Sequence, residues 1–424
     1  MRISPVSLYS LAGVFQAAGS SGAATLAPFF MKFHGYPVAL VGIPLVINGV
    51  GRICSDLLSG MLAARFGSGI LLVTAVSIAL AAGAIGVLFR DVMPVFLSLW
   101  AVLGLTEAMF GLSLRQIAFD HSATHQQGRA QGRVAAAVGV GFTIGPVLAG
   151  FAGSRWGPDV LLLLYALPQS VALALVIMAG GHRIGTPAKE GKLAFWGAGK
   201  ELLSRPSFLA VCLAIFQTFL FLIGVTRVAF PFLAIRRGLS LDIVGTIVGL
   251  SRLADTCGRL VGGWLSDRIG SQRVILTGIV IGVPMFVAET YGWNILTLLI
   301  PLSFMTMGFG FTNVASTTFA LQSAGPRNKG IALGLARASN SVGTALGPLV
   351  SGLLIQTLGY EGGFFAMGLF SVAVSLAVWY GVKDTSRPSK WILTQACLQS
   401  HEASLLSSEA LLVEDTLPNA AQCA

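Results

Sequence analysis

Long apolar runs separated by short polar stretches cover most of the chain between residues 7 and 382. A bilayer core of about 30 Å requires roughly 20 predominantly apolar residues in a helix, and twelve runs are candidates by this measure. A backbone in lipid must satisfy its own hydrogen bonds, so each run predicts a helix. The predicted spans are Ser7–Phe30, Val38–Ala63, Gly69–Phe89, Val92–Ala118, Val134–Gly153, Asp159–Gly180, Phe208–Leu233, Leu241–Leu265, Val274–Glu289, Ile295–Phe319, Ile331–Leu358 and Gly363–Val382.

The composition supports a chain whose surface faces lipid. Hydrophobic residues make up 54% of the 424 residues and charged residues 10%, against roughly 25% charged in a soluble domain. The mean hydropathy is +0.80. A soluble globule of this length would lack the polar residues to cover itself, so we predict an all-α membrane protein. The net charge of +10 then indicates basic cytoplasmic loops, and not a nucleic-acid-binding surface.

The lysines and arginines between the predicted helices are unevenly distributed. If the N-terminus is cytoplasmic, the outside segments hold only Lys32, Arg90, Arg155, Arg236 and Arg237. Basic residues accumulate on the cytoplasmic side of membrane proteins, so we expect both termini in the cytoplasm. The expected location is the plasma membrane, which in a bacterium is the inner membrane.

The two halves of the predicted helix array repeat each other. The segment Gly60–Ser68 recurs as Gly263–Ser271, and Pro28-Phe29 returns as Pro231-Phe232, both at an offset of 203 residues (263 − 60 and 231 − 28). Parallel repeats of this kind build secondary transporters with a substrate site at the repeat interface. The predicted division is an N-terminal six-helix bundle (1–180), a cytoplasmic linker (181–206), a C-terminal six-helix bundle (207–383) and a disordered cytoplasmic tail (384–424), with a central cavity between the bundles.

Two motifs resemble those of the major facilitator superfamily, and the resemblance extends from about Ser7 to Val382. The family's loop signature, G-x-L-x-D-R-x-G-x-x-R/K, follows its second and eighth helices. In the second copy the matching residues are Gly263, Leu265, Asp267, Arg268, Gly270 and Arg273. The resemblance implies that Asp267 and the arginines form a charge cluster that keeps the cytoplasmic face shut, with Gly263 permitting close helix contact. A purely topogenic basic loop is the alternative, and the first copy has Ala64 in place of the acid.

The second motif, G-x8-G-x3-G-P-x2-G-G, lies in the fifth predicted helix and recurs in the eleventh. The matching residues are Gly132, Gly141, Gly145, Pro146 and Gly150 in the first copy and Gly343, Gly347, Pro348 and Gly352 in the second. Small residues at this spacing allow close packing, expected here between the fifth and eighth helices, and proline permits a bend. In the superfamily the motif is associated with drug–proton antiporters, so the resemblance implies export. Uptake carriers with similar helices leave proton symport open.

Ionisable groups inside the predicted spans are candidate functional residues, because a charge in the bilayer is unfavourable unless it is paired or hydrated. They are Arg52, Asp56, Glu107, Arg115, Arg227, Arg252, Asp255 and Arg259. The spacing of Arg52 and Asp56, and of Asp255 and Arg259, predicts an ion pair within one helix in each half, with reversed polarity. Such pairs either neutralise charge structurally, or exchange protons when the substrate binds the arginine.

The arginines in the spans outnumber the carboxylates, which suggests an organic anion or zwitterion as the substrate. The alternative to an anionic substrate is that water in a central cavity hydrates the surplus arginines. Gln16 and Gln217 each follow a phenylalanine, once in each half. Their amides would hydrogen-bond either a substrate or a neighbouring helix.

Glu107 is the predicted proton carrier, with Asp255 as the next candidate. The residues three and four positions from Glu107 supply no base, so its partner must come from another helix that can move between states. A carboxylate that gains and loses an arginine neighbour can bind and release a proton. Trp100 occupies the position of the family's usual arginine in this helix, so the family's arginine-based coupling is not carried over.

Other classes of function have less support in the sequence. A transporter-derived solute sensor would require a signalling domain, and the tail from residue 384 offers none. We find no H-E-x-x-H pair and no G-x4-G-K-S/T nucleotide loop. We therefore predict no enzyme, no metal and no cofactor, with the proton gradient as the energy source. The expected partners are a small-molecule substrate and the lipid bilayer, for a monomeric chain that binds no nucleic acid.

The predicted topology is tested by epitope tags placed at the N-terminus and after Lys390. Both tags should be reached by antibody only after the cytoplasmic face is made accessible. A tag that reacts in sealed, right-side-out vesicles would contradict the predicted orientation.

Overall fold

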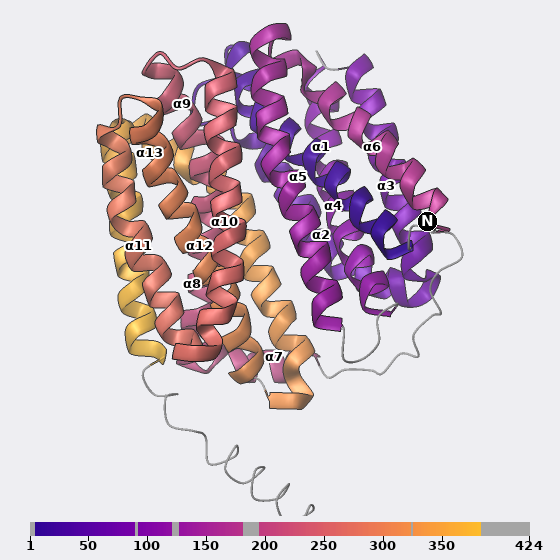
Figure 1. The fold of residues 1–424 in the computed structure, drawn as a ribbon, viewed down its shortest axis with the longest axis vertical. Coiled ribbons are helices and arrows are strands. Elements are labelled where there is room, and N and C mark those ends of the chain that lie inside the picture. Colours follow the sequence, from indigo (N-terminus) through magenta and orange to yellow (C-terminus); the bar gives the residue numbers. More distant parts are fainter. Residues whose placement is uncertain (1–4, 90–91, 121–126, 181–194, 324, 383–424) are drawn as a thin grey trace, which may run out of the picture.

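The computed structural model describes residues 5–89, 92–120, 127–180, 195–323 and 325–382. The described residues form long helices in two groups that lie side by side (Figure 1). The first group consists of α1 (Pro5–Phe33), α2 (Ile43–Phe66), α3 (Ser68–Leu88), α4 (Met93–Asp120), α5 (Gln127–Trp156), the short η2 (Pro158–Val160) and α6 (Leu161–Met178). The second consists of α8 (Pro206–Gly224), η4 (Val225–Ala229), α9 (Phe230–Arg236), α10 (Leu241–Ile269), α11 (Ser271–Tyr291), α12 (Ile295–Ser323) and α13 (Gly325–Val382).

The all-α membrane fold predicted from the apolar runs is confirmed. Within the described residues, eight helical stretches are long and apolar enough to cross a membrane, and one of them, 331–381, contains the last two predicted spans. The α10 helix also runs the length of its group, but it carries several charged residues and is less apolar than these eight.

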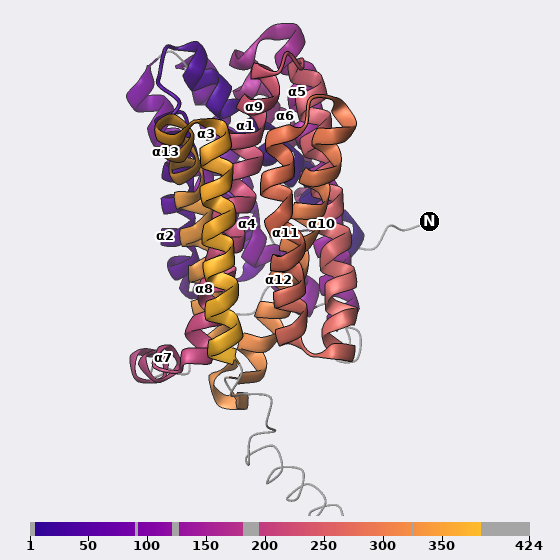
Figure 2. The same ribbon diagram turned by 90° about the vertical axis from the view of Figure 1, so that its left-hand side faces the viewer.

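The last two predicted spans form two helices that meet at a kink at Gly359, where φ is 72°, and that share the label α13. The helices depart from the predicted spans at two places. The seventh span is divided into α8, a π-helical turn and α9. A further helix, α7 (Phe195–Leu203), lies within the predicted linker and crosses the end of the second group (Figure 2). Residues 181–194 of that linker and the predicted tail from 384 lie outside the described residues.

Each group of helices has apolar packing of its own. The largest cluster of buried side chains is drawn from residues 202–378 and includes Phe208, Phe221, Phe286 and Phe364. A second cluster, around Tyr9, Leu72 and Ile117, is drawn entirely from the first group. In lipid, such packing and close backbone contact hold helices together, because apolar side chains gain little by leaving lipid.

The predicted glycine-proline motifs bring backbones together, but mainly with partners other than those expected. Gly145 lies against α1, where an added Cβ would be 2.9 Å from the backbone nitrogen of Gly22. Gly141 also faces α1, and in the second copy Gly343 and Gly347 face α8. The expected approach of α5 to α10 occurs at Gly150, where an added Cβ would be 2.6 Å from the Leu241 carbonyl oxygen.

The two groups meet closely at one end of the helices, the end where α1 ends and α2 begins. The Phe29 and Phe232 rings lie 5.0 Å apart there, and the backbone N–H of Ala39 donates to Gln356 Oε1 at 2.8 Å. An added Cβ at Gly42 would lie 2.7 Å from Pro348 Cβ. We call this the closed end. It lies at the opposite end of the helices from α7, because α8 begins just after α7 and the chain reaches the closed end at Arg236.

The glycine contacts are tested by comparing Gly145→Ala with Gly263→Ala. A methyl group at residue 145 would overlap α1, and such overpacking costs about 1–3 kcal/mol. At residue 263 it would lie 3.6 Å from Val314 Cγ1, an ordinary contact. We expect Gly145→Ala to lower the melting temperature of the purified protein in detergent by several degrees and Gly263→Ala to leave it nearly unchanged. Equal melting temperatures would contradict the assigned packing.

Candidate functional site

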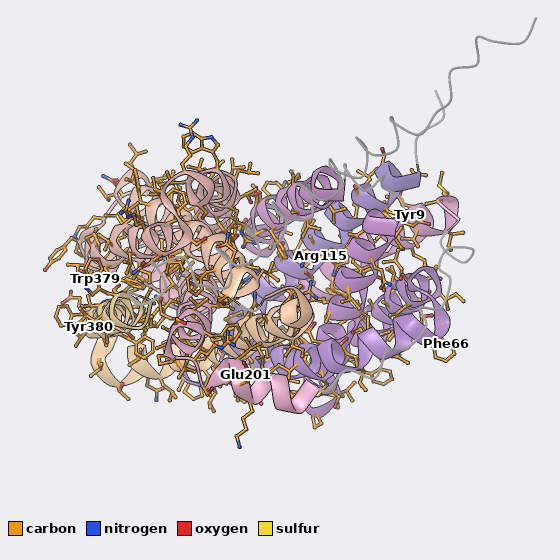
Figure 3. The ribbon with its side chains drawn as sticks, turned by 90° about the horizontal axis from the view of Figure 1, so that it is seen from below. Tyr9, Phe66, Arg115, Glu201, Trp379 and Tyr380 are labelled. Atoms are coloured by element: carbon orange, nitrogen blue, oxygen red, sulfur yellow. The ribbon has the colours of Figure 1, made fainter. Side chains whose placement is uncertain are left out.

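The predicted charged residues gather where the two groups of helices face each other. Arg115 of α4 lies between the groups in the view from below (Figure 3). Its charge interacts with those of Arg337 on α13, Arg259 on α10, and Arg52 and Asp56 on α2. Charges from both repeats therefore share one region of the protein interior.

Arg52 pairs with Glu107, and not with Asp56 on its own helix as predicted. The Nη1 atom of Arg52 lies 3.5 Å from Glu107 Oε2. The reason is the close approach of α2 and α4, where an added Cβ at Gly104 would strike the Asn48 backbone. The prediction that Glu107 draws its partner from another helix is confirmed. Both helices, however, belong to the first group.

Asp56 is bound to the second group of helices instead. Its Oδ2 accepts a hydrogen bond of 2.8 Å from Ser341 Oγ on α13. Because this bond joins the two groups, it must break if they separate at this level.

The second predicted ion pair, Asp255 with Arg259, is confirmed. Arg259 Nε donates to Asp255 Oδ1 at 3.1 Å and Nη2 donates to Oδ2 at 2.8 Å. A bidentate contact within one helix stays intact when helices move relative to one another. It therefore holds a charge pair in α10 without fixing the position of any neighbouring helix.

Arg227 and Arg252 have different surroundings. Arg227 lies in the π-helical turn η4 and donates to the Ser21 carbonyl oxygen and to Thr25 Oγ1 of α1. Arg252 Nη2 donates to Thr226 Oγ1 at 2.8 Å, while its Nε is buried and has no hydrogen-bond partner among the described residues. The guanidinium groups of Arg227 and Arg252 thus donate to neutral carbonyl and hydroxyl oxygens.

Exposure of the charged side chains rises with distance from the closed end. Arg227 and Arg252 are 5% and 7% exposed, whereas the side chains of Arg52 and Arg259 are 37% and 39% exposed. Since these side chains lie between the groups, the gradient indicates that the site is reached from the end opposite the closed one.

The two predicted glutamines have separate surroundings. Gln217 is fully buried and donates from Nε2 to Ser371 Oγ of α13 at 2.9 Å, which is the predicted contact to a neighbouring helix. Gln16 is buried on α1.

The predicted gating loop is mostly helical. Gly263 lies inside α10, and the close contact expected there falls on Gly262, where an added Cβ would be 2.9 Å from Phe311 Cα. Arg268 covers the Trp264 ring at 4.1 Å. The turn itself is Gly270, with φ 88°, and Arg273 is exposed at the start of α11. The side chain of Asp267, the predicted centre of the charge cluster, is outside the described part of the chain.

Uncharged polar residues complete the site, and sequence reasoning missed them. Ser20 and Asn48 lie close to the Glu107 carboxylate, and Thr25, Thr226 and Ser341 bind the charges described above. Asn48 lies one helical turn from Arg52 and Thr226 is adjacent to Arg227, a spacing that would have identified these two.

Comparison with known proteins assigns the family. A model described as the Major Facilitator Superfamily matches residues 9–337 and, in a second match, residues 223–405. The chain belongs to this superfamily. This is a superfamily of membrane transporters and not of enzymes.

Two curated relatives share a limited part of this chain. An uncharacterized MFS-type transporter of Methanocaldococcus jannaschii is 25% identical over 143 residues, which are 34% of this chain and 37% of the relative. The MFS-type transporter SLC18B1 of Mus musculus is 27% identical over 179 residues, 38% of this chain and 37% of the relative. The chain thus matches little more than a third of the length of either.

Solved structures share the fold over nearly the whole chain. The nucleoside transporter NupG has a TM-score of 0.70 at 14% identity, covering 90% of this chain and 100% of its own. A POT family transporter in complex with a thioalcohol-conjugated peptide has a TM-score of 0.75 at 10% identity, covering 90% and 96%. A bacterial homolog of the human lysosomal transporter Spinster, inward-facing and unoccupied, has a TM-score of 0.68 at 15% identity, covering 90% and 92%.

The Asp255–Arg259 pair is tested by single and double substitution. Asp255→Asn leaves a guanidinium without its counter-charge in a lipid-surrounded region, which is strongly destabilising. We expect a clearly lower melting temperature for Asp255→Asn, and partial recovery in the double variant Asp255→Asn, Arg259→Gln. A double variant less stable than Asp255→Asn would show that Arg259 has another essential partner.

Proposed function

We propose that this protein exports a small organic anion or zwitterion in exchange for protons, by alternating access of one site between two six-helix halves (1–180 and 207–383). The observation that carries the proposal is the set of charged residues between the halves, where Glu107, Arg227, Arg252 and Asp255 are largely removed from solvent. Intramembrane charges in transporters mark substrate and proton pathways.

The excess of arginines supports an anionic group on the substrate. In the described part of the site, Arg52 and Arg259 are paired with carboxylates, and the hydrogen-bond acceptors of Arg227 and Arg252 are neutral oxygens. A carboxylate or phosphate satisfies a guanidinium better than a neutral oxygen does, because it carries the opposite charge and can accept two parallel hydrogen bonds.

Glu107 is the proposed proton carrier, with Asp255 as the alternative. Its carboxylate is influenced by Arg52 from its own half and by Arg227 from the other. The contact with Arg52 lies within the first group of helices, whereas the distance to Arg227 changes when the halves move. The charged form of Glu107 would therefore be favoured in one state and disfavoured in the other, as proton coupling requires.

The closed end indicates which state of the proposed transport cycle this conformation represents. If the N-terminus is cytoplasmic, as predicted, the closed end faces outward and the site opens to the cytoplasm. The predicted glycine-proline motif favours export from this state, and uptake by proton symport is the alternative. When the closed end opens, Phe29 would separate from Phe232, and Gly42 would separate from Pro348.

The proposal is tested in proteoliposomes, using a substrate first selected by thermal-shift screening of organic acids, zwitterions and cationic drugs. Glu107→Gln should abolish accumulation driven by a pH gradient, yet retain downhill exchange of labelled for unlabelled substrate. Glu201→Gln, which alters an exposed carboxylate on α7, should behave as the wild type. Gradient-driven accumulation by Glu107→Gln would exclude Glu107 as the carrier, and accumulation in the same direction as the proton flux would favour symport.

A further inference from the structure

We propose that Arg227 and Arg252 together bind an anionic group of the substrate, a carboxylate or phosphate, and that this group releases Arg227 from α1 and so loosens the closed end. The proposal rests on the proposed transport function. It names the residues that hold the anion and the step that the anion controls.

The two guanidinium groups are buried, and that of Arg252 is incompletely satisfied. They are 5% and 7% exposed, and their hydrogen-bond acceptors among the described residues are a carbonyl and two hydroxyl oxygens. Arg252 Nε donates to none of the described residues. The nearest carboxylates are engaged, Glu107 with Arg52 and Asp255 with Arg259. Two adjacent buried guanidinium groups with neutral acceptors, one of them with a free donor, match a planar anion with two acceptor oxygens.

The repeat shows that these arginines belong to one half only. At the offset of 203 that relates Pro28 to Pro231, Arg227 corresponds to Ala24 and Arg252 to Gly49. By contrast, the charged positions 52 and 56 correspond to charged residues at 255 and 259. A role in holding the fold would be expected in both halves, so charges confined to one half indicate a ligand.

The π-helical turn connects the two arginines. Pro231 has no N–H, and its ring displaces the carbonyl four residues earlier, which is that of Arg227. The helix is wider here, over Val225–Ala229, and such turns are frequent at functional sites. Arg227 lies in this turn, and Arg252 is hydrogen-bonded to the adjacent Thr226. An anion that contacts both arginines therefore acts on a single turn.

The anion would compete with α1 for Arg227. The bonds from Arg227 to Ser21 and Thr25 join the second half to the first, and Thr25 is one helical turn from Phe29, which packs on Phe232 at the closed end. An anion offers a full opposite charge and two acceptor oxygens for a bidentate contact, and the neutral oxygens of α1 offer neither. Arg227 would therefore turn from α1 to the anion, and one link between the halves would be lost.

Binding is measured on the purified full-length protein in detergent, without any gradient. The probes are succinate, benzoate and inorganic phosphate at constant ionic strength, with choline chloride as the cationic control. At least one anion should raise the melting temperature of the wild type, with choline inactive. Arg252→Gln should weaken the apparent affinity by about tenfold or more, whereas Arg205→Gln, an exposed position outside the site, should not. No response to any of the three anions, or an unchanged affinity in Arg252→Gln, would overturn the anion site.

The release step is measured by hydrogen–deuterium exchange in peptides covering residues 26–36 and 228–239. Thr25→Val removes one acceptor of Arg227, so it should accelerate exchange at both segments without ligand. The anion should do the same in the wild type and not in Arg252→Gln. Anion binding with unchanged exchange would overturn the release step. The binding assay uses no gradient, so it is independent of proton coupling. If the protein binds the anion but does not couple transport to protons, the proposed function is contradicted and the anion site is not.

Discussion

A charged side chain inside a bilayer must find its counter-charge or its hydrogen-bond partners within the protein, because lipid supplies neither. In this chain that constraint draws charged residues of both repeats into the region between the two groups of helices. Asp255 finds its partner within its own helix and Arg52 on a neighbouring one, while Asp56 and Arg227 find theirs across the divide. The last two contacts couple the charge distribution to the relative position of the halves.

The duplicated architecture makes such coupling possible. The positions at which the two repeats differ make it depend on a ligand. Both copies of the glycine-proline motif pack on the first helix of their own group, α1 or α8, so this packing is repeated in the two halves. The π-helical turn is found in the second half and not in α1, and Arg227 and Arg252 correspond to the small residues Ala24 and Gly49. The repeated helix packing would allow the halves to adopt two similar arrangements. The arginines without carboxylate partners would make the change between them depend on a bound ligand.

The sequence predicted best those features that depend on one helix, and it predicted less well which side chains pair between helices. The Asp255–Arg259 pair follows from a spacing of four residues and was predicted correctly. Arg52 has the same spacing to Asp56, yet it binds Glu107 because Gly51 and Gly104 bring α2 and α4 together. Pro231 was recognised as a repeat position, but the π-helical turn before it depends on tertiary packing. The kink at Gly359, by contrast, falls between the last two predicted spans, as expected.

The central claim is that the protein alternates between two states: in one the two groups of helices are closed at the end described here, and in the other they are closed at the opposite end. It is tested most directly by pairs of spin labels in a cysteine-free background, with one pair at Phe66 and Ile269, and the other at Trp156 and Tyr291, all of which are exposed at helix ends. Distance distributions are recorded with and without a bound anion and at two pH values. The account predicts that the first distance shortens whenever the second lengthens. Distances that both lengthen together, or that stay fixed in protein shown to transport, would contradict it.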